Sequence, residues 1–187
     1  MNNFKRIGLF DVAPPTEEIT MSNLWDWLNL RKMFPASGHY DVKDIVMRFH
    51  PVDMPLTQQE VFDSNATVSY FPWYHLKECR ALVERHCPEG YVIGRVLVAM
   101  LLPGGVISSH VDEGKYADNH ERYHFVLHSN PYCTFICGNE ATQMRSGEIW
   151  TFNHKIEHQV INADKENPRV HIIADYRKVE QDESNDK

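Results

Sequence analysis

The sequence predicts a mainly β protein of jelly-roll type, with helices placed before most of the strands. Short segments of strand-like composition follow one another from residue 122 to residue 176, and turn signals such as Gly138-Asn139 separate them. A near-continuous apolar run at 95–102 precedes them and fits a strand buried on both faces. Short strands at this density are typical of a jelly roll.

Ten segments are expected as strands, and each is bounded by glycine, proline or polar residues. They are 7–10, 44–49, 95–102, 107–110, 122–128, 133–137, 140–144, 148–152, 158–162 and 169–176. A further strand is possible within 61–70, and 51–58 is expected as a loop. The first strand is expected at a sheet edge, ended by Pro14-Pro15.

Two amphipathic helices are expected to cover the outer face of the larger sheet. The first has Thr16 as its N-cap and the apolar stripe Met21, Leu24, Trp25 and Leu28. The second begins at Pro72, ends at 88–90, and has the stripe Leu76, Cys79, Val83 and Cys87.

Length and composition predict one soluble globular domain. The chain has 187 residues, of which 42% are hydrophobic and 24% charged. We assign 1–177 to this domain, with 1–92 covering the sheet and 93–177 forming the jelly-roll core, and 178–187 to a flexible polar tail. The formal net charge of -7, with no cluster of lysine and arginine, argues against a nucleic-acid partner.

The chain has no apolar stretch of the length that a membrane span needs, and its first residues lack the apolar core of a signal peptide. A cytoplasmic location without a membrane partner is therefore expected. The cysteines at 79, 87, 133 and 137 show no zinc-ribbon spacing and are expected as buried, reduced thiols. The oligomeric state is not readable from the sequence.

The stretch 110–169 holds the candidate site. In an extended segment, His110 and Asp112 point to the same side and can share a metal, while Val111 points away. A third ligand has to come from a distant strand, and His158 is the candidate; His154 competes with it. Two imidazoles and one carboxylate on one side of a divalent ion are the ligand set of non-haem Fe(II) oxygenases, although zinc also accepts such ligands.

A cationic face accompanies these ligands. Alternation places Arg122 and His124 on one side of their strand, and Arg169 on the same side of its own strand as His171 and Asp175. Buried cations need an anionic partner, which a bound cosubstrate or substrate would supply. We expect Arg169 to hold a carboxylate of an oxo-acid through its planar fork. His120, in the polar loop 112–121 at the pocket mouth, is expected as a solvated side chain.

The motifs Arg122-x-His124, 147–162 and 169–175 resemble the aspartyl/asparaginyl beta-hydroxylase family of Fe(II)- and 2-oxoglutarate-dependent oxygenases. The resemblance covers about 94–177. It implies a double-stranded β-helix of the cupin-like kind. It also implies Fe(II) at His110, Asp112 and His158, and 2-oxoglutarate held by Arg169 with help from Arg122 and His124. O2 is the second cosubstrate, and ascorbate is a candidate stimulant.

One feature departs from the animal members of that family, which have glycine in place of the carboxylate ligand. With Asp112 this chain looks more like the free-proline hydroxylases and the small bacterial members. The implied reaction is hydroxylation of an amino acid or an aspartyl/asparaginyl-type residue, with release of succinate and CO2. The substrate is either a free amino acid or part of a peptide or protein, and Arg122 or Arg145 is available for its carboxylate.

An alternative of a different class is a metal-binding, cupin-like isomerase or small-anion sensor without oxygenase activity. Both readings share the sheet and the metal, and they differ in whether Arg169 and Arg122 serve 2-oxoglutarate. A structural interaction module with a degenerate pocket is a third reading, which the presence of His110, Asp112, His158 and Arg169 argues against.

Overall fold

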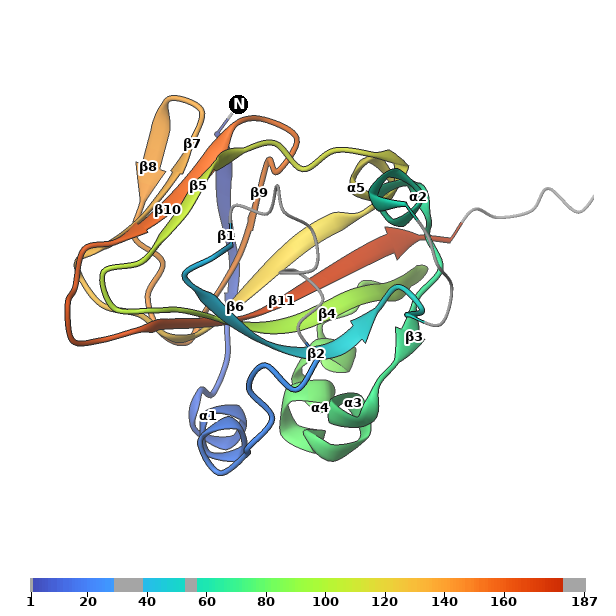
Figure 1. Cartoon of the computed structure of the whole chain (residues 1–187), viewed down its shortest axis with the longest axis horizontal. Helices are drawn as coiled ribbons and strands as arrows, with labels where there is room; N and C mark the ends of the chain where they lie inside the picture. The colour runs from blue at the N-terminus through green and yellow to red at the C-terminus, as the bar shows by residue number, and fades with distance from the viewer. Residues whose placement is uncertain (1, 29–38, 53–56, 180–187) are drawn as a thin grey trace, which may run out of the picture.

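The computed structural model describes residues 2–28, 39–52 and 57–179. Over these residues, the chain forms two antiparallel sheets that face each other, with helices outside the larger one (Figure 1). The mainly β fold class predicted from the sequence is confirmed. Among the described helices, none combines the length and the apolar composition that a transmembrane span needs.

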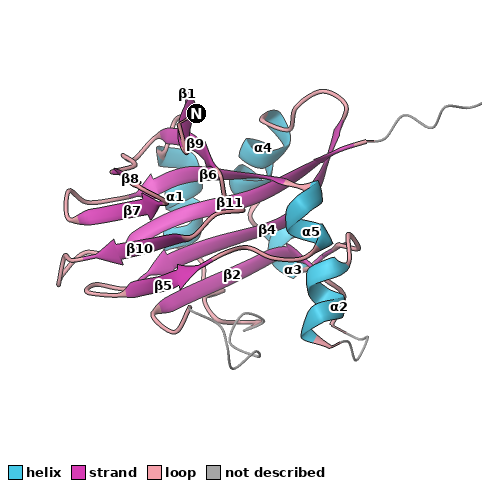
Figure 2. Cartoon of the chain, turned by 90° about the horizontal axis from the view of Figure 1, so that it is seen from above, coloured by secondary structure: helices cyan, strands magenta, loops and turns pink. Residues whose placement is uncertain are grey.

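Within the described residues, the larger sheet has seven strands and the smaller sheet four. The larger sheet runs in the order β1 (Phe4–Leu9), β9 (Glu148–Phe152), β6 (Glu121–His128), β11 (Arg169–Lys178), β4 (Tyr91–Leu101), β2 (Val42–Phe49) and β3 (Val68–Ser69). The smaller sheet runs in the order β5 (Val106–His110), β10 (His158–Asn162), β7 (Cys133–Cys137) and β8 (Glu140–Thr142). In Figure 1 the smaller sheet lies across from β6, β11 and β4, and Figure 2 shows the same strands from above.

Each strand of the larger sheet divides its side chains between two apolar layers. On β11, Val170, Ile172 and Ala174 belong to the outer core, which the helices α1 (Ala13–Thr20), α3 (Phe71–His75) and α4 (Lys77–Arg85) cover. The inner core lies between the sheets and joins Ala99 of β4 to Val160 of β10. Because alternate residues of a strand face opposite sides, the inner side of β11 is left for the polar residues of the site.

Each expected strand overlaps a strand of the structure, although β1 begins before the predicted 7–10 and β4 before the predicted 95–102. The segments 133–137, 148–152 and 158–162 match β7, β9 and β10 at both ends, and 169–176 falls two residues short of the end of β11. The edge position predicted for the first strand is also correct, because β1 pairs only with β9 within the described sheet. Residues 180–187 of the predicted tail, and 53–56 of the predicted loop, lie outside the described residues.

The predicted helix beginning at Thr16 was wrong. Helix α1 begins at Ala13 and ends at Thr20, so Pro14 and Pro15 open the helix instead of ending a turn. Proline suits the first helical turn because that turn leaves its N–H groups without helical acceptors. Met21 of the predicted stripe is 78% exposed as a result.

Two further helical features differ from the prediction. The expected single helix after Pro72 is split at Leu76 into α3 and α4; Leu76, Cys79 and Val83 of its apolar stripe are buried, whereas Cys87 lies beyond the end of α4 and is half-buried. A helix was missed at α2 (Gln58–Asp63), where Thr57 and Glu60 form a capping box. The pair Thr57-x-x-Glu60 was a readable signal for that helix.

Candidate active site

Three side chains from two separate parts of the chain converge at one end of the smaller sheet. One ligand atom each from His110, Asp112 and His158 lies within 4.8 Å of the other two. His110 ends β5 and His158 begins β10, and the two residues are direct partners across these antiparallel strands. The structure thus brings together the three residues that the sequence singled out. His154, the alternative to His158 as third ligand, lies beside the triad, with its Nδ1 3.4 Å from Oδ2 of Asp112.

Backbone carbonyl groups orient both imidazoles. Nδ1 of His110 donates to the carbonyl of Ser108 at 2.8 Å, and Nδ1 of His158 donates to the carbonyl of Ile156 at 2.9 Å. When Nδ1 carries the proton, Nε2 presents its lone pair, so each ring is held in the tautomer that binds a metal. Burial lowers the pKa of His158 to about 4, which keeps this ring neutral at pH 7.

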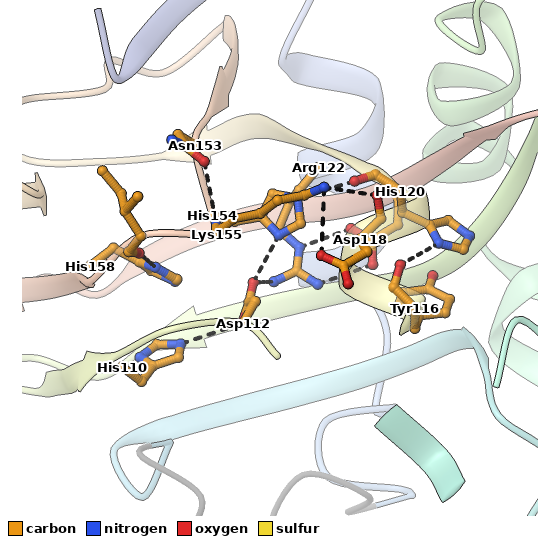
Figure 3. Close-up of polar contacts among 12 residues, drawn as sticks. His110, Asp112, Tyr116, Asp118, His120, Arg122, Asn153, His154, Lys155 and His158 are labelled. Atoms are coloured by element: carbon orange, nitrogen blue, oxygen red, sulfur yellow. Dashed lines mark hydrogen bonds and ion pairs between the residues drawn. The ribbon is translucent and has the colours of Figure 1, made fainter. Parts of the chain in front are cut away.

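The two oxygens of Asp112 face different neighbours (Figure 3). Oδ1 lies 3.6 Å from Nε2 of His110, and Oδ2 accepts from NH1 of Arg122. Burial opposes ionisation of Asp112, but the charge of Arg122 outweighs it and holds the pKa of the carboxyl well below its usual range. The site therefore offers one anionic oxygen and two imidazole nitrogens.

This donor set fits Fe(II). Two imidazoles and one carboxylate on one side of the ion form the facial triad, which leaves positions open for an oxo-acid and O2. Each of the three ligands also has a hydrogen-bond partner that holds it in position: a backbone carbonyl for each imidazole, and Arg122 for the carboxylate.

A second polar cluster lies deeper between the sheets. Arg169 on β11 is 2% exposed, and its Nε and NH2 lie 2.9 Å and 2.7 Å from the two ring nitrogens of His171. Nδ1 of His124 lies 3.1 Å from Nδ1 of His171. Burial, and then the charge of Arg169, lowers the pKa of His171 well below its usual value, so that ring is neutral.

One cavity of about 150 Å³ connects the two clusters. His110 and His158 line it on the metal side and Arg169 in the second cluster, and Arg95, Arg122 and Asp175 face the same cavity. Apolar side chains line the stretch between them, and include Leu97, Ile107, Phe135, Phe152, Val160 and Ile173. A small molecule with a chelating head, a methylene stem and a distal carboxylate matches this sequence of surfaces.

Arg122, which we expect to help hold 2-oxoglutarate, lines the same cavity between two carboxylates. All three of its guanidinium nitrogens contact carboxylates: Nε and NH2 bind Asp175, at 2.8 Å and 3.1 Å, and NH1 binds Asp112. These contacts give it a role beside the metal ligands, and the cosubstrate role stays a prediction that the contacts do not support. His124 keeps its predicted place near Arg169, since its Nδ1 lies 3.4 Å from NH2 of that residue.

Several residues near the site were not singled out from the sequence. Arg95 lines the cavity, and its guanidinium carbon lies 3.7 Å from the ring centre of Tyr116 in α5 (Lys115–Asn119). The ring of His39 packs edge-to-face on that of His110, with centroids 5.4 Å apart. A signal for Arg95 was present in the sequence, because it is a charged residue within the otherwise apolar strand predicted at 95–102.

The prediction that His120 is solvated was wrong. This side chain is 4% exposed, and its ring stacks on that of Tyr116 with centroids 3.8 Å apart. The loop that contains it was expected to be irregular, but it includes α5 and buries Tyr116 and Ala117. The polar composition of 112–121 gave no indication that Tyr116 and Ala117 would be buried.

The profile of one protein family matches this sequence. Its description is aspartyl/asparaginyl beta-hydroxylase, and the match covers residues 74–178, which is more than half of the chain. No curated protein matches the sequence.

Solved structures of similar fold include oxygenases. A viral collagen prolyl hydroxylase from Paramecium Bursaria Chlorella virus-1, in complex with 2-oxoglutarate, has a TM-score of 0.53 at 14% identity, over 95% of this chain and 97% of that one. An oxidoreductase of the 2OG-Fe(II) oxygenase family from Burkholderia pseudomallei has a TM-score of 0.51 at 12% identity, over 92% and 93% of the two chains. At these identities the likeness concerns the fold.

Proposed function

This chain belongs to the aspartyl/asparaginyl beta-hydroxylase family of 2-oxoglutarate-dependent oxygenases, and from that premise we propose that it hydroxylates an amino acid or an aspartyl/asparaginyl-type residue. In the proposed reaction, the substrate C–H bond, O2 and 2-oxoglutarate give the hydroxylated product, succinate and CO2. Fe(II), 2-oxoglutarate and O2 are the cofactor and cosubstrates of such an enzyme.

The observation that carries the proposal is one cavity with a metal-binding triad at one end and a buried arginine at the other. His110, Asp112 and His158 would hold Fe(II), and Arg169 would pair with the far carboxylate of 2-oxoglutarate. When bound, Fe(II) with 2-oxoglutarate supplies the activation of O2 for hydroxylation.

The protein's own groups bind, orient and exclude water. Arg169 is held in place by His171 before any ligand arrives, so little side-chain entropy is lost when a carboxylate binds. The apolar walls formed by Phe135, Val160 and Ile173 keep water from the middle of the cavity. Strands of both sheets supply these residues, and this rigid support fixes the distance between the two ends of the cavity.

A free amino acid or a short peptide is the proposed substrate, with a residue on a folded protein as the other candidate. One side chain beside the cosubstrate would reach the triad, and the remainder of a peptide would lie at the mouth of the cavity. His39, which packs on His110, lies among the residues that such a substrate would meet.

A screen for succinate release tests the proposal. The purified protein is incubated with Fe(II), 2-oxoglutarate, ascorbate and a panel of free amino acids and short peptides, and products are examined by mass spectrometry for one added oxygen. We expect succinate in proportion to the hydroxylated product. Anaerobic calorimetry with Mn(II) then measures 2-oxoglutarate binding directly. A protein that binds the metal but not 2-oxoglutarate would be the isomerase or anion sensor instead.

A further inference from the structure

The pairing of Arg122 with Asp175 is set by the sheet itself. Arg122 on β6 and Asp175 on β11 are direct partners across adjacent antiparallel strands. Two hydrogen bonds join Nε and NH2 of the guanidinium to the two carboxylate oxygens, at 2.8 Å and 3.1 Å. Asp175 is 2% exposed. A buried two-point contact of this kind fixes both the position and the plane of the guanidinium.

The third nitrogen of Arg122 points at the metal site. NH1 donates to Oδ2 of Asp112, which leaves Oδ1 on the side of His110 (Figure 3). The backbone holds the same residue from another direction, because the amide of Asp112 donates to the carbonyl of His154 at 3.1 Å. One carboxylate oxygen is therefore engaged by a cation, and the other is turned toward the imidazoles.

We propose that Arg122 and Asp175 form a clamp that holds Asp112 as a one-oxygen metal ligand and so keeps a coordination position open for cosubstrate or O2. The proposal rests on the proposed function for the identity of the metal ligands. In it, Arg122 is a positioning residue that acts through Asp112, and Asp175 acts through Arg122.

Two physical arguments support the clamp. A carboxylate without a partner on its second oxygen can bind a metal through both oxygens, which would occupy one more position of the ion. Arg122 competes for that second oxygen, and Nδ1 of His154 lies 3.4 Å from it. Asp175 in turn holds Nε and NH2 of the guanidinium, which leaves NH1 directed at Asp112, and leaving a buried carboxylate without its cation would be costly.

Co(II) binding to the whole protein tests the clamp without cosubstrate or substrate. Titration gives the dissociation constant, and the visible absorption of bound Co(II) weakens as its coordination number rises. For Arg122→Gln we expect the dissociation constant to rise about 10- to 100-fold and the absorption to weaken. Asp175→Asn is expected to change both readouts in the same direction but less, because NH1 still reaches Asp112.

Two further variants separate positioning from general damage. Arg122→Lys keeps the charge beside Asp112 and is expected to recover part of the Co(II) affinity and absorption. Glu148→Gln removes a different buried carboxylate of the larger sheet, one that pairs with Arg6, and is expected to lower thermal stability alone. Asp175→Asn carries the test if Arg122→Gln does not fold.

The outcomes distinguish this inference from the proposed function. An Arg122→Gln protein with wild-type Co(II) affinity and absorption, but weaker 2-oxoglutarate binding, would overturn the clamp and give Arg122 the cosubstrate role expected from the sequence. A wild-type protein that binds no Co(II) would instead overturn the proposed metal site. If the Co(II) results are as expected but the protein releases no succinate, the clamp is supported and the proposed oxygenase reaction is contradicted.

Discussion

His110 and His158 lie opposite each other across the antiparallel pair of β5 and β10, and their ring centroids are 4.3 Å apart. Neither strand alone holds enough ligands for a metal. The candidate centre therefore exists only when two segments from distant parts of the chain have paired, and metal binding is linked to the folded state.

This linkage predicts that metal stabilises the protein against heat. We expect Mn(II) to raise the Tm, because it binds the folded protein and not the unfolded chain. At a free metal concentration of about 100 times Kd, the gain in unfolding free energy is about 2.7 kcal/mol. Differential scanning calorimetry with Mn(II) and with EDTA measures it. A His158→Ala variant that gains as much as the wild type would show that the metal binds elsewhere.

Loss of any one triad ligand is expected to abolish turnover. His110→Ala, Asp112→Ala and His158→Ala each leave two protein ligands, which is too few to hold Fe(II) in the required geometry. Succinate release in the presence of the hydroxylated substrate is the measurement. His75→Ala changes an exposed imidazole on α3 and serves as the matched control, with wild-type turnover expected. Full turnover by a triad variant would mean that the ligands are assigned wrongly.

Arg169 is expected to determine affinity for 2-oxoglutarate. Arg169→Gln removes a buried charge that would pair with the far carboxylate, at a cost of at least about 2 kcal/mol, or roughly 30-fold in Kd. Calorimetry with the Mn(II) protein measures this, and Mn(II) affinity itself should not change. Arg177→Gln, on the same strand but outside the cavity, is the control. Equal binding by Arg169→Gln and the wild type would place the cosubstrate away from this residue.

The neutral state of His171 predicts a pH dependence of stability. Burial and Arg169 lower the pKa of this ring in the folded protein, whereas in the unfolded chain it takes up a proton near pH 6.5. Below that pH the unfolded state binds more protons, so unfolding free energy falls as pH falls, by up to about 1.4 kcal/mol per unit. Urea unfolding of the metal-free protein between pH 7.5 and 5.5 measures the slope. His171→Gln should show a shallower slope, and an unchanged one would contradict the assignment.

Gly94 is expected to be needed for the packing of the loop that follows Asp112. A Cβ atom at this position would lie 2.5 Å from the hydroxyl of Tyr116 and 2.8 Å from the ring of His120. Gly94→Ala therefore pushes the loop away, and we expect a loss of about 1 to 3 kcal/mol in unfolding free energy. Gly8→Ala is the control, since its Cβ would meet Ile149 at an ordinary 3.4 Å. Equal stability of the two variants in urea would refute this account.

Local patterns predicted the strands well and the helices poorly. Alternation along 169–175 placed Arg169 and Asp175 on the cavity side and Val170, Ile172 and Ala174 in the outer core, as the structure has them. Such alternation is the pattern expected of a strand whose two faces lie against different surroundings. The helices are short, and their ends depend on caps and prolines, so an apolar stripe alone misplaced the first one.

The sequence by itself determined the family, the mainly β fold and the three side chains that converge in the candidate metal site, because strand periodicity and motif order are local properties. Only the tertiary structure decided which partner each charged group has. Strand register sets Arg122 against Asp175, and loop geometry brings Asp112 to its NH1, two contacts that the sequence did not predict. Partner choice for a buried charge depends on which groups the folded sheets bring within hydrogen-bonding distance, and no local pattern carries that information.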